Sequence, residues 1–95
     1  MSEELSKYRI EQAEESLAEA ELLFNSGQGF RGAVNRAYYG MFYAALALLA
    51  KTGKASSKHS GIIALFDENY VKQGIFSKEL SKALHRAFEF RQMSD

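Results

Sequence analysis

Polar residues interrupt the otherwise apolar segment 30–51, and their side chains suit the binding of a phosphate and a base. At helical spacing Asn35 and Tyr39 share one face, while Arg36 and Tyr43 belong to the next. Arginine and asparagine side chains hold phosphates, and tyrosine rings stack on bases. The same groups can instead satisfy a neighbouring helix or a dimer interface, because a buried polar group without a partner costs about 1–3 kcal/mol. The sequence leaves both interpretations open.

Arg91 and Asp95 form a second candidate pair, near the end of the chain. They continue the apolar stripe of the last expected helix, which consists of Leu80, Leu84, Ala87 and Phe88. A guanidinium on a core-facing stripe needs a carboxylate or a bound anion as a partner. Arg91 and Asp95 are four residues apart, so that they can pair with each other. They therefore either fix the register of this helix or bind a phosphate.

The two histidines are isolated from each other. His59 is expected in the first turn of a helix, on the side of Ile63 and Phe66, where it packs, caps the helix or contributes to a site. His85 shares a face with Ser81 that should be exposed to solvent. A single histidine on a helix is a poor metal signal, and the sequence has no glycine-rich phosphate loop and no Ser-His-Asp order. We therefore expect no metal and no cofactor.

The composition indicates that helices carry these residues. The chain has 95 residues, of which 46% are hydrophobic and 25% charged, and it contains no proline. Because proline breaks helix interiors, its absence favours an all-α protein. The length suits a single domain, 1–95, with one small core. Dimerisation would add buried surface to such a domain.

Hydrophobic periodicity and glycine or serine punctuation predict four helices with short connections. Their expected ranges are 3–25, 30–51, 58–72 and 77–95, with Ser77 capping the last. The predicted buried stripe of the first helix consists of Ile10, Ala13, Leu17, Ala20 and Phe24. The second helix is apolar on nearly all sides, which predicts that it is central, and Gly40 in its small-residue line lets another helix approach closely. The expected fold is an antiparallel up-and-down bundle of four helices.

The distribution of charge and the lack of cysteine indicate the kind of ligand and the cellular location to expect. Residues 1–24 hold seven glutamates against two basic residues, whereas residues 25–95 hold ten basic against five acidic residues. The first helix therefore has an acidic outer face, and the basic remainder can attract phosphates. The sequence has no cysteine and no signal-peptide pattern, and its longest apolar run, 41–50, is about half a membrane span. We expect a cytoplasmic protein without membrane contact.

Three blocks of the sequence resemble the HEPN domain family, and in particular its small stand-alone prokaryotic subfamily. They are Asn35-Arg-Ala-Tyr-Tyr-Gly-Met-Phe-Tyr-Ala44, Lys58-His-Ser-Gly61 with Phe66, and Phe88-Glu-Phe-Arg-Gln-Met-Ser-Asp95. The first block is fairly specific to the family, and the other two support it. The resemblance implies a dimeric helical bundle, often encoded beside a minimal nucleotidyltransferase in a toxin–antitoxin pair.

Many members of this family are metal-independent ribonucleases, whose hallmark is an arginine followed after four to six residues by a histidine. By this resemblance Arg91 matches the hallmark arginine, and Asn35 matches a polar helper on the second helix. The given sequence ends four residues after Arg91, and neither His59 nor His85 stands at the required spacing. Asp95 matches an aspartate of the subfamily, but the tyrosine expected after it is missing. The hallmark is incomplete, as in a shortened form of a longer domain.

We therefore expect a homodimer that binds nucleotide or RNA phosphates without cleaving them and works with a nucleotidyltransferase partner in a toxin–antitoxin-like module. The expected binding residues are Asn35, Arg36, Tyr39, Tyr43, His59, Arg91 and Asp95, among which Asn35 and Arg91 are the catalytic candidates. One alternative is a metal-independent endoribonuclease, in which His59 would have to replace the missing histidine. The other is a purely structural dimerisation module. Nothing in the sequence brings His59 within reach of Arg91.

Overall fold

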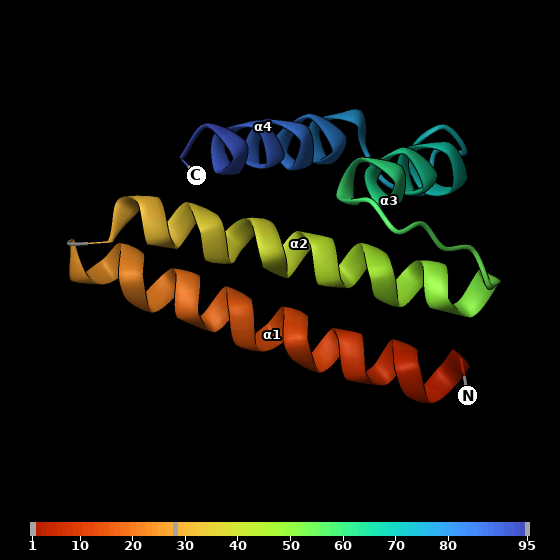
Figure 1. The fold of residues 1–95 in the computed structure, drawn as a ribbon, viewed down its shortest axis with the longest axis horizontal. Coiled ribbons are helices and arrows are strands. Elements are labelled where there is room, and N and C mark those ends of the chain that lie inside the picture. Colours follow the sequence, from red (N-terminus) through yellow and green to blue (C-terminus); the bar gives the residue numbers. More distant parts are fainter. Residues whose placement is uncertain (1, 28, 95) are drawn as a thin grey trace.

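The protein is predominantly helical. The computed structural model describes residues 2–27 and 29–94, and within these ranges it contains no strand. Its elements are α1 (Ser2–Ser26), α2 (Phe30–Thr52), α3 (His59–Phe66), the π-helical turn η1 (Asp67–Val71) and α4 (Lys78–Ser94). The expected all-α bundle of four helices is confirmed (Figure 1). None of the helices in the described ranges is both long and apolar enough to cross a membrane.

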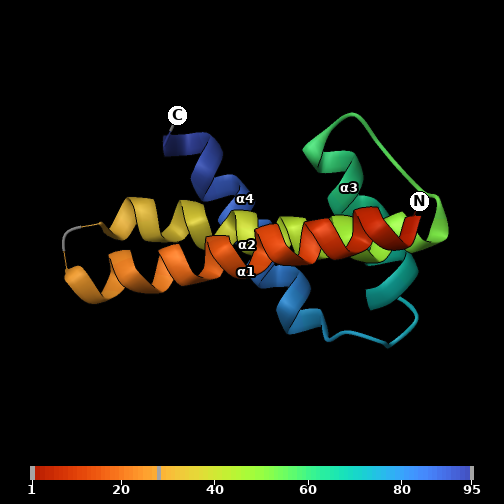
Figure 2. The ribbon, with the colours of Figure 1, turned by 90° about the horizontal axis from the view of Figure 1, so that it is seen from below.

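Helix α2 is the central element of the bundle. Helices α1 and α2 run antiparallel side by side, and α3 and α4 lie against the opposite side of α2 (Figure 1). Figure 2 shows that α4 crosses α2 obliquely, and that the end of α4 and the beginning of α3 rise on the same side of α2. The prediction of a central second helix is confirmed. Because of this position, α2 presents side chains to α1 on one side and to α3 and α4 on the other.

The main core lies between α2, α3 and α4. It consists of Tyr38, Phe42, Ala45, Leu49, Ile62, Ile63, Phe66 and Leu84. Tyr38 is completely buried. Burial of each large apolar side chain contributes about 1.5–3 kcal/mol. Within this cluster Leu84 is the residue contributed by α4, so it anchors the helix that carries Arg91.

The contact between α1 and α2 differs from the predicted one. Phe24 is 66% exposed, and Ile10 and Leu17 are exposed as well, so the predicted buried stripe of α1 is wrong for these three residues. The described residues of α1 that are buried are all small: Ser6, Ala13, Ser16 and Ala20. Helix α1 packs mainly against α2, and small residues along the contact line let the two backbones come close. The larger side chains therefore lie at the edges of this contact.

Gly40 marks a close approach of the two helices. A Cβ atom at this position would lie 2.6 Å from Cγ and Cδ2 of Leu17 in α1, so a larger residue here would displace the Leu17 side chain. Elsewhere along the same contact, the Ser6 hydroxyl donates a hydrogen bond of 2.9 Å to the carbonyl oxygen of Ala47. This bond satisfies a buried polar group. The helix that approaches the small-residue line of α2 is therefore α1 of the same chain.

The segment predicted as one helix over 58–72 is divided into two parts. Helix α3 passes into η1, where the amide of Lys72 donates to the carbonyl oxygen of Asp67, five residues earlier and 2.8 Å away. The Asp67 carboxylate accepts hydrogen bonds from the Ser81 hydroxyl and the His85 imidazole, each 2.6 Å long. His85 is exposed, as expected, but it also ties η1 to α4.

The C-terminal end of α2 and the start of α4 lie where glycine and serine residues predict them. Gly53 has a left-handed backbone, with φ of 73°, and ends α2. The Ser77 hydroxyl accepts a hydrogen bond from the amide of Leu80, 3.1 Å away, and caps α4. These signals stop and restart the chain so that α3 and α4 fold back onto α2.

Candidate functional site

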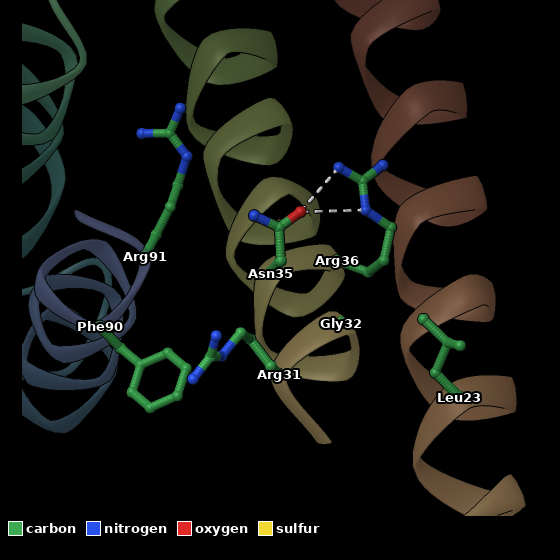
Figure 3. Close-up of a pocket in the computed structure, with 7 residues that line it drawn as sticks. All are labelled: Leu23, Arg31, Gly32, Asn35, Arg36, Phe90 and Arg91. Atoms are coloured by element: carbon green, nitrogen blue, oxygen red, sulfur yellow. Dashed lines mark hydrogen bonds between the residues drawn. The ribbon is translucent and has the colours of Figure 1, made fainter. Parts of the chain in front are cut away.

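A basic pocket opens between α2, α4 and the end of α1. Its volume is about 410 Å³, and it is lined by Leu23, Arg31, Gly32, Asn35, Arg36, Phe90 and Arg91 (Figure 3). Three of these residues are arginines, and none is acidic. A pocket with this lining favours an anion, because its guanidinium groups are charged at every physiological pH. Asn35, Arg36 and Arg91, all predicted as binding residues, meet here.

Arg36 fixes the orientation of the Asn35 side chain. Its guanidinium donates two hydrogen bonds to Oδ1 of Asn35, of 3.3 Å from Nε and 3.0 Å from Nη2. The side-chain amide nitrogen of Asn35 is turned away from Arg36, towards the α4 side of α2 (Figure 3). Arg36 also meets Glu19 of α1 at 3.5 Å, a partly exposed ion pair of small energy. The arrangement leaves Asn35 with N–H donors that face the pocket.

The Arg91 guanidinium contacts aromatic rings. It contacts no acidic side chain among the described residues. Its Cζ atom lies 5.7 Å from the centre of the Tyr38 ring and 5.2 Å from the centre of the Tyr39 ring. Its side chain makes no hydrogen bond or ion pair with any residue that the structure describes. Cation–π contacts leave the N–H groups of a guanidinium available to an anion. Asp95, the partner considered from the sequence, lies outside the described residues.

Arg31 extends the basic lining by one helical turn. It is exposed, and it lies four residues before Asn35, on the same side of α2. Figure 3 shows its guanidinium beside the ring of Phe90 from α4. Arg31 is not among the residues predicted from the sequence, although its spacing of four from Asn35 is a usable signal. Phe90, which also lines the pocket, packs edge-on against Phe30, with ring centres 6.3 Å apart.

His59 packs on the same aromatic rings of α2. Its Nδ1 lies 2.8 Å from the Tyr38 hydroxyl, and its ring stacks on Phe42 with centres 4.1 Å apart. It also contacts the ring of Tyr39 edge-on, at 6.0 Å. His59 is in the first turn of α3, as expected, and the fold brings it to the Tyr38 and Tyr39 rings that also hold Arg91. The sequence alone did not reveal this proximity, because it depends on how α3 and α4 fold back.

The environment shifts the pKa values of Tyr38 and His59. Burial raises the pKa of Tyr38 to about 12, against the opposing effect of the Arg91 charge, so its hydroxyl keeps its proton. Burial lowers the pKa of His59, and the positive charge of Arg91 lowers it further. The imidazole is therefore neutral at neutral pH. A neutral imidazole can accept a proton, whereas a protonated one cannot.

Most of the predicted site residues share one side of α2. Tyr39 lies between Arg36, whose Cζ is 5.0 Å from its ring centre, and Tyr43, whose ring centre is 5.6 Å away. Tyr43 thus extends the aromatic row beyond the pocket. The structure adds Arg31 and Tyr38 to the predicted residues. Tyr38 was missed because a tyrosine within an apolar helix has the sequence pattern of a core residue.

Comparisons with known proteins show which family the chain belongs to. The model of the HEPN domain family matches residues 6–95. The chain is 42% identical to a UPF0332 protein of Thermotoga maritima, over 98% of this chain and 70% of that protein. It is 39% identical to "Putative toxin MJ0142" of Methanocaldococcus jannaschii, over 90% of this chain and 58% of that protein. The chain belongs to the HEPN domain family.

The relatives are longer than the part that matches. UPF0332 protein PH1297 of Pyrococcus horikoshii is 42% identical over 86% of this chain, but the matched part is 56% of that protein. The alignments thus span between 56% and 70% of these three relatives. No solved structure matches the chain.

Proposed function

We propose that this HEPN protein binds single-stranded RNA and holds its backbone phosphates in the basic pocket between α2 and α4. The observation that supports the proposal is the pairing of Arg91 with aromatic rings rather than with a described carboxylate. Beside it, the Asn35 amide donors and the Arg31 guanidinium complete an all-donor lining. A phosphate supplies the acceptors that these groups need.

Half-buried aromatic rings next to the pocket favour RNA over an isolated phosphate. Tyr39 and Tyr43 follow each other along α2 on the path that leaves the pocket. Single-stranded RNA is recognised by stacking of its unpaired bases on such rings, while arginines contact the backbone. A free nucleotide offers the same phosphate groups, but its single base cannot stack on both tyrosine rings.

We further propose that the protein is toxin-like and works with partners. Two relatives carry the word toxin in their names, and the family resemblance points to a homodimer and a minimal nucleotidyltransferase partner. Co-expression with a small nucleotidyltransferase from the same genome tests this. A stable complex on a sizing column that contains two copies of this chain is expected. Separate elution of the two proteins, or a monomeric chain, would contradict the proposal.

The binding of RNA is tested by fluorescence anisotropy with a labelled single-stranded oligonucleotide. Each phosphate contacted lowers the logarithm of the association constant by about 0.7 per decade of salt for single strands. Two to three phosphate contacts therefore predict a slope of about −1.4 to −2.1 between 50 and 200 mM salt. Unlabelled RNA should displace the probe, and ATP at the same phosphate concentration should not. No binding at the lowest salt, or equal competition by ATP, would refute RNA binding.

A further inference from the structure

His59 and Arg91 come from helices that are separate in sequence, yet both contact the same two tyrosine rings of α2. Cζ of Arg91 lies 5.7 Å from the ring centre of Tyr38 and 5.2 Å from that of Tyr39. The imidazole centre of His59 is 6.0 Å from each of these ring centres. The beginning of α3 and the end of α4 rise on the same side of α2 (Figure 2). The imidazole therefore lies beside the guanidinium to which the proposed function assigns an RNA phosphate.

The Tyr38 hydroxyl determines which nitrogen of His59 carries the hydrogen. Tyr38 is completely buried, and its hydroxyl has one hydrogen-bond partner among the described residues, Nδ1 of His59, 2.8 Å away. Burial raises the pKa of Tyr38 to about 12, so the hydroxyl keeps its proton and needs an acceptor. If Nδ1 carried the hydrogen, it would donate to the Tyr38 oxygen and leave the buried O–H without an acceptor. Tyr38 therefore donates to Nδ1, and the hydrogen of the neutral imidazole is on Nε2.

Nε2 of His59 is the ring nitrogen that a ligand can reach. It has no hydrogen-bond partner among the described residues. Within those residues, no buried nitrogen or oxygen of a side chain lacks a partner. Because His59 as a whole is half-buried, its unpartnered Nε2 must be reached by solvent. Burial and the Arg91 charge lower the pKa of His59, so at neutral pH Nε2 offers one N–H donor without a positive charge.

We propose that His59 binds the RNA backbone as a neutral hydrogen-bond donor and gives its Nε2 hydrogen to an oxygen of the phosphate that Arg91 binds. The inference rests on the proposed binding of RNA in the basic pocket, and it extends that site to α3. A phosphate is the expected acceptor, because the Arg91 charge beside the imidazole has no described carboxylate as a partner and attracts an anion. The site then combines charged donors from α2 and α4 with an uncharged donor from α3.

The same geometry removes His59 from the role of a general base. A base at Nε2 needs a lone pair on that nitrogen, which exists in the neutral ring only when Nδ1 carries the hydrogen. The buried Tyr38 hydroxyl opposes that tautomer, since it has no other acceptor among the described residues. The structure therefore disfavours the alternative in which His59 replaces the missing histidine of a ribonuclease.

The first measurement is the tautomer of His59 in the whole, isotope-labelled chain. Long-range proton–nitrogen NMR spectra at neutral pH distinguish a protonated ring nitrogen from an unprotonated one. We expect Nε2 to be protonated and Nδ1 to be unprotonated, and we expect the Nε2 signal to shift when single-stranded RNA is added. An unprotonated Nε2 would overturn the inference, and so would an Nε2 signal that does not move at saturating RNA.

The second measurement is the affinity of two variants of His59 for a labelled single-stranded oligonucleotide. Both are made together with Tyr38→Phe, because the buried hydroxyl would otherwise lose its acceptor. His59→Phe keeps a ring against Phe42 but has no donor, and it should bind RNA about 10-fold more weakly than the wild type. His59→Gln supplies an amide donor and should recover most of this loss. The matched control is His85→Phe, since His85 bonds to Asp67 on another side of α4 and should bind like the wild type.

The dependence of this loss on salt and on sequence identifies the contact. A neutral donor releases no counterion, so the loss caused by His59→Phe should be constant between 50 and 200 mM salt, whereas a lost arginine contact flattens the salt dependence. Phosphates carry no sequence information, so the loss should be equal for oligouridylate, oligoadenylate and single-stranded DNA. A loss confined to one base, or to RNA, would place the contact on the base or on the 2′-hydroxyl and would overturn the phosphate contact.

The outcomes separate the two proposals. If the wild type binds RNA and the variant with His59→Phe binds it equally well, the role of His59 is refuted and RNA binding stands. If that variant loses its helical content, the tautomer and the RNA-induced shift of Nε2 in the wild type decide the question. If the wild type does not bind RNA at all, the proposed function fails and the inference fails with it.

Discussion

Arg91→Ala is expected to weaken the binding of single-stranded RNA by about 10- to 150-fold. A hydrogen bond between a charged donor and its acceptor contributes about 1.5–3 kcal/mol, which corresponds to that range of Kd. The fold should survive, because the Arg91 side chain makes no hydrogen bond or ion pair with a described residue, so the variant loses only cation–π contacts. Anisotropy titration of the purified variant measures the effect, and circular dichroism verifies the helical content.

Two further variants show whether RNA binding depends on the bidentate geometry of the Arg91 guanidinium as well as on its charge. Arg91→Lys keeps the positive charge but cannot bind a phosphate in a bidentate manner, so an intermediate loss is expected. Arg86→Ala removes an exposed arginine of the same helix that does not line the pocket, and it is the matched control. The site would be wrong if Arg86→Ala weakened binding as much as Arg91→Ala.

Leu84→Ala is expected to lower the free energy of unfolding by about 2–5 kcal/mol. Leu84 is 2% exposed and is the α4 member of the buried cluster in the described chain, so its truncation leaves a cavity beneath α4. Small domains are stable by about 5–15 kcal/mol in total, so this loss is a large share. Since α4 carries Arg91, RNA affinity should fall together with stability.

Urea denaturation followed by circular dichroism measures this change. Met93→Ala is a suitable control, because Met93 is on the same helix and is 85% exposed. Its effect should stay within about 0.5 kcal/mol, as for surface substitutions in general. If the two variants are equally stable, the packing of α4 on α2 described above is incorrect.

The helices and most of the polar residues of the site were predictable because they depend on local patterns. The apolar period of residues 30–51 predicts a central helix, and Asn35, Arg36 and Tyr39 stand on it at helical spacing. The ends at Gly53 and Ser77 depend on residues with specific backbone or capping chemistry. Such signals act over a few residues, so the sequence contains them completely.

The buried side of α1 was not predictable from periodicity. The larger residues Leu17 and Phe24 form a regular stripe, but the contact line runs over Ala13 and Ala20. Gly40 contributes to this, because the Leu17 side chain lies over it instead of being covered by large side chains of α2. The pattern of hydrophobic residues in one helix does not reveal the shape of the helix surface against which it packs.

The proximity of His59 and Arg91 was also not predictable from the sequence. It depends on the tertiary placement of α3 and α4, which Asp67 in η1 helps to fix by bonding to His85 of α4. Tyr38 has the pattern of a core residue and is one, yet its hydroxyl joins the site through His59. A residue that is both core and site gives no separate signal in a single sequence.

The central claim is that RNA phosphates bind between α2 and α4, and an NMR titration with single-stranded RNA tests it most directly. The probes are the backbone amides of the labelled chain, the Nε–H signals of its arginines and the side-chain amide of Asn35. We predict the largest changes at Arg91, Arg31 and Asn35, which line the pocket. The largest changes near Lys51 and Lys54, at the opposite end of α2, would contradict the claim, and so would the absence of any change.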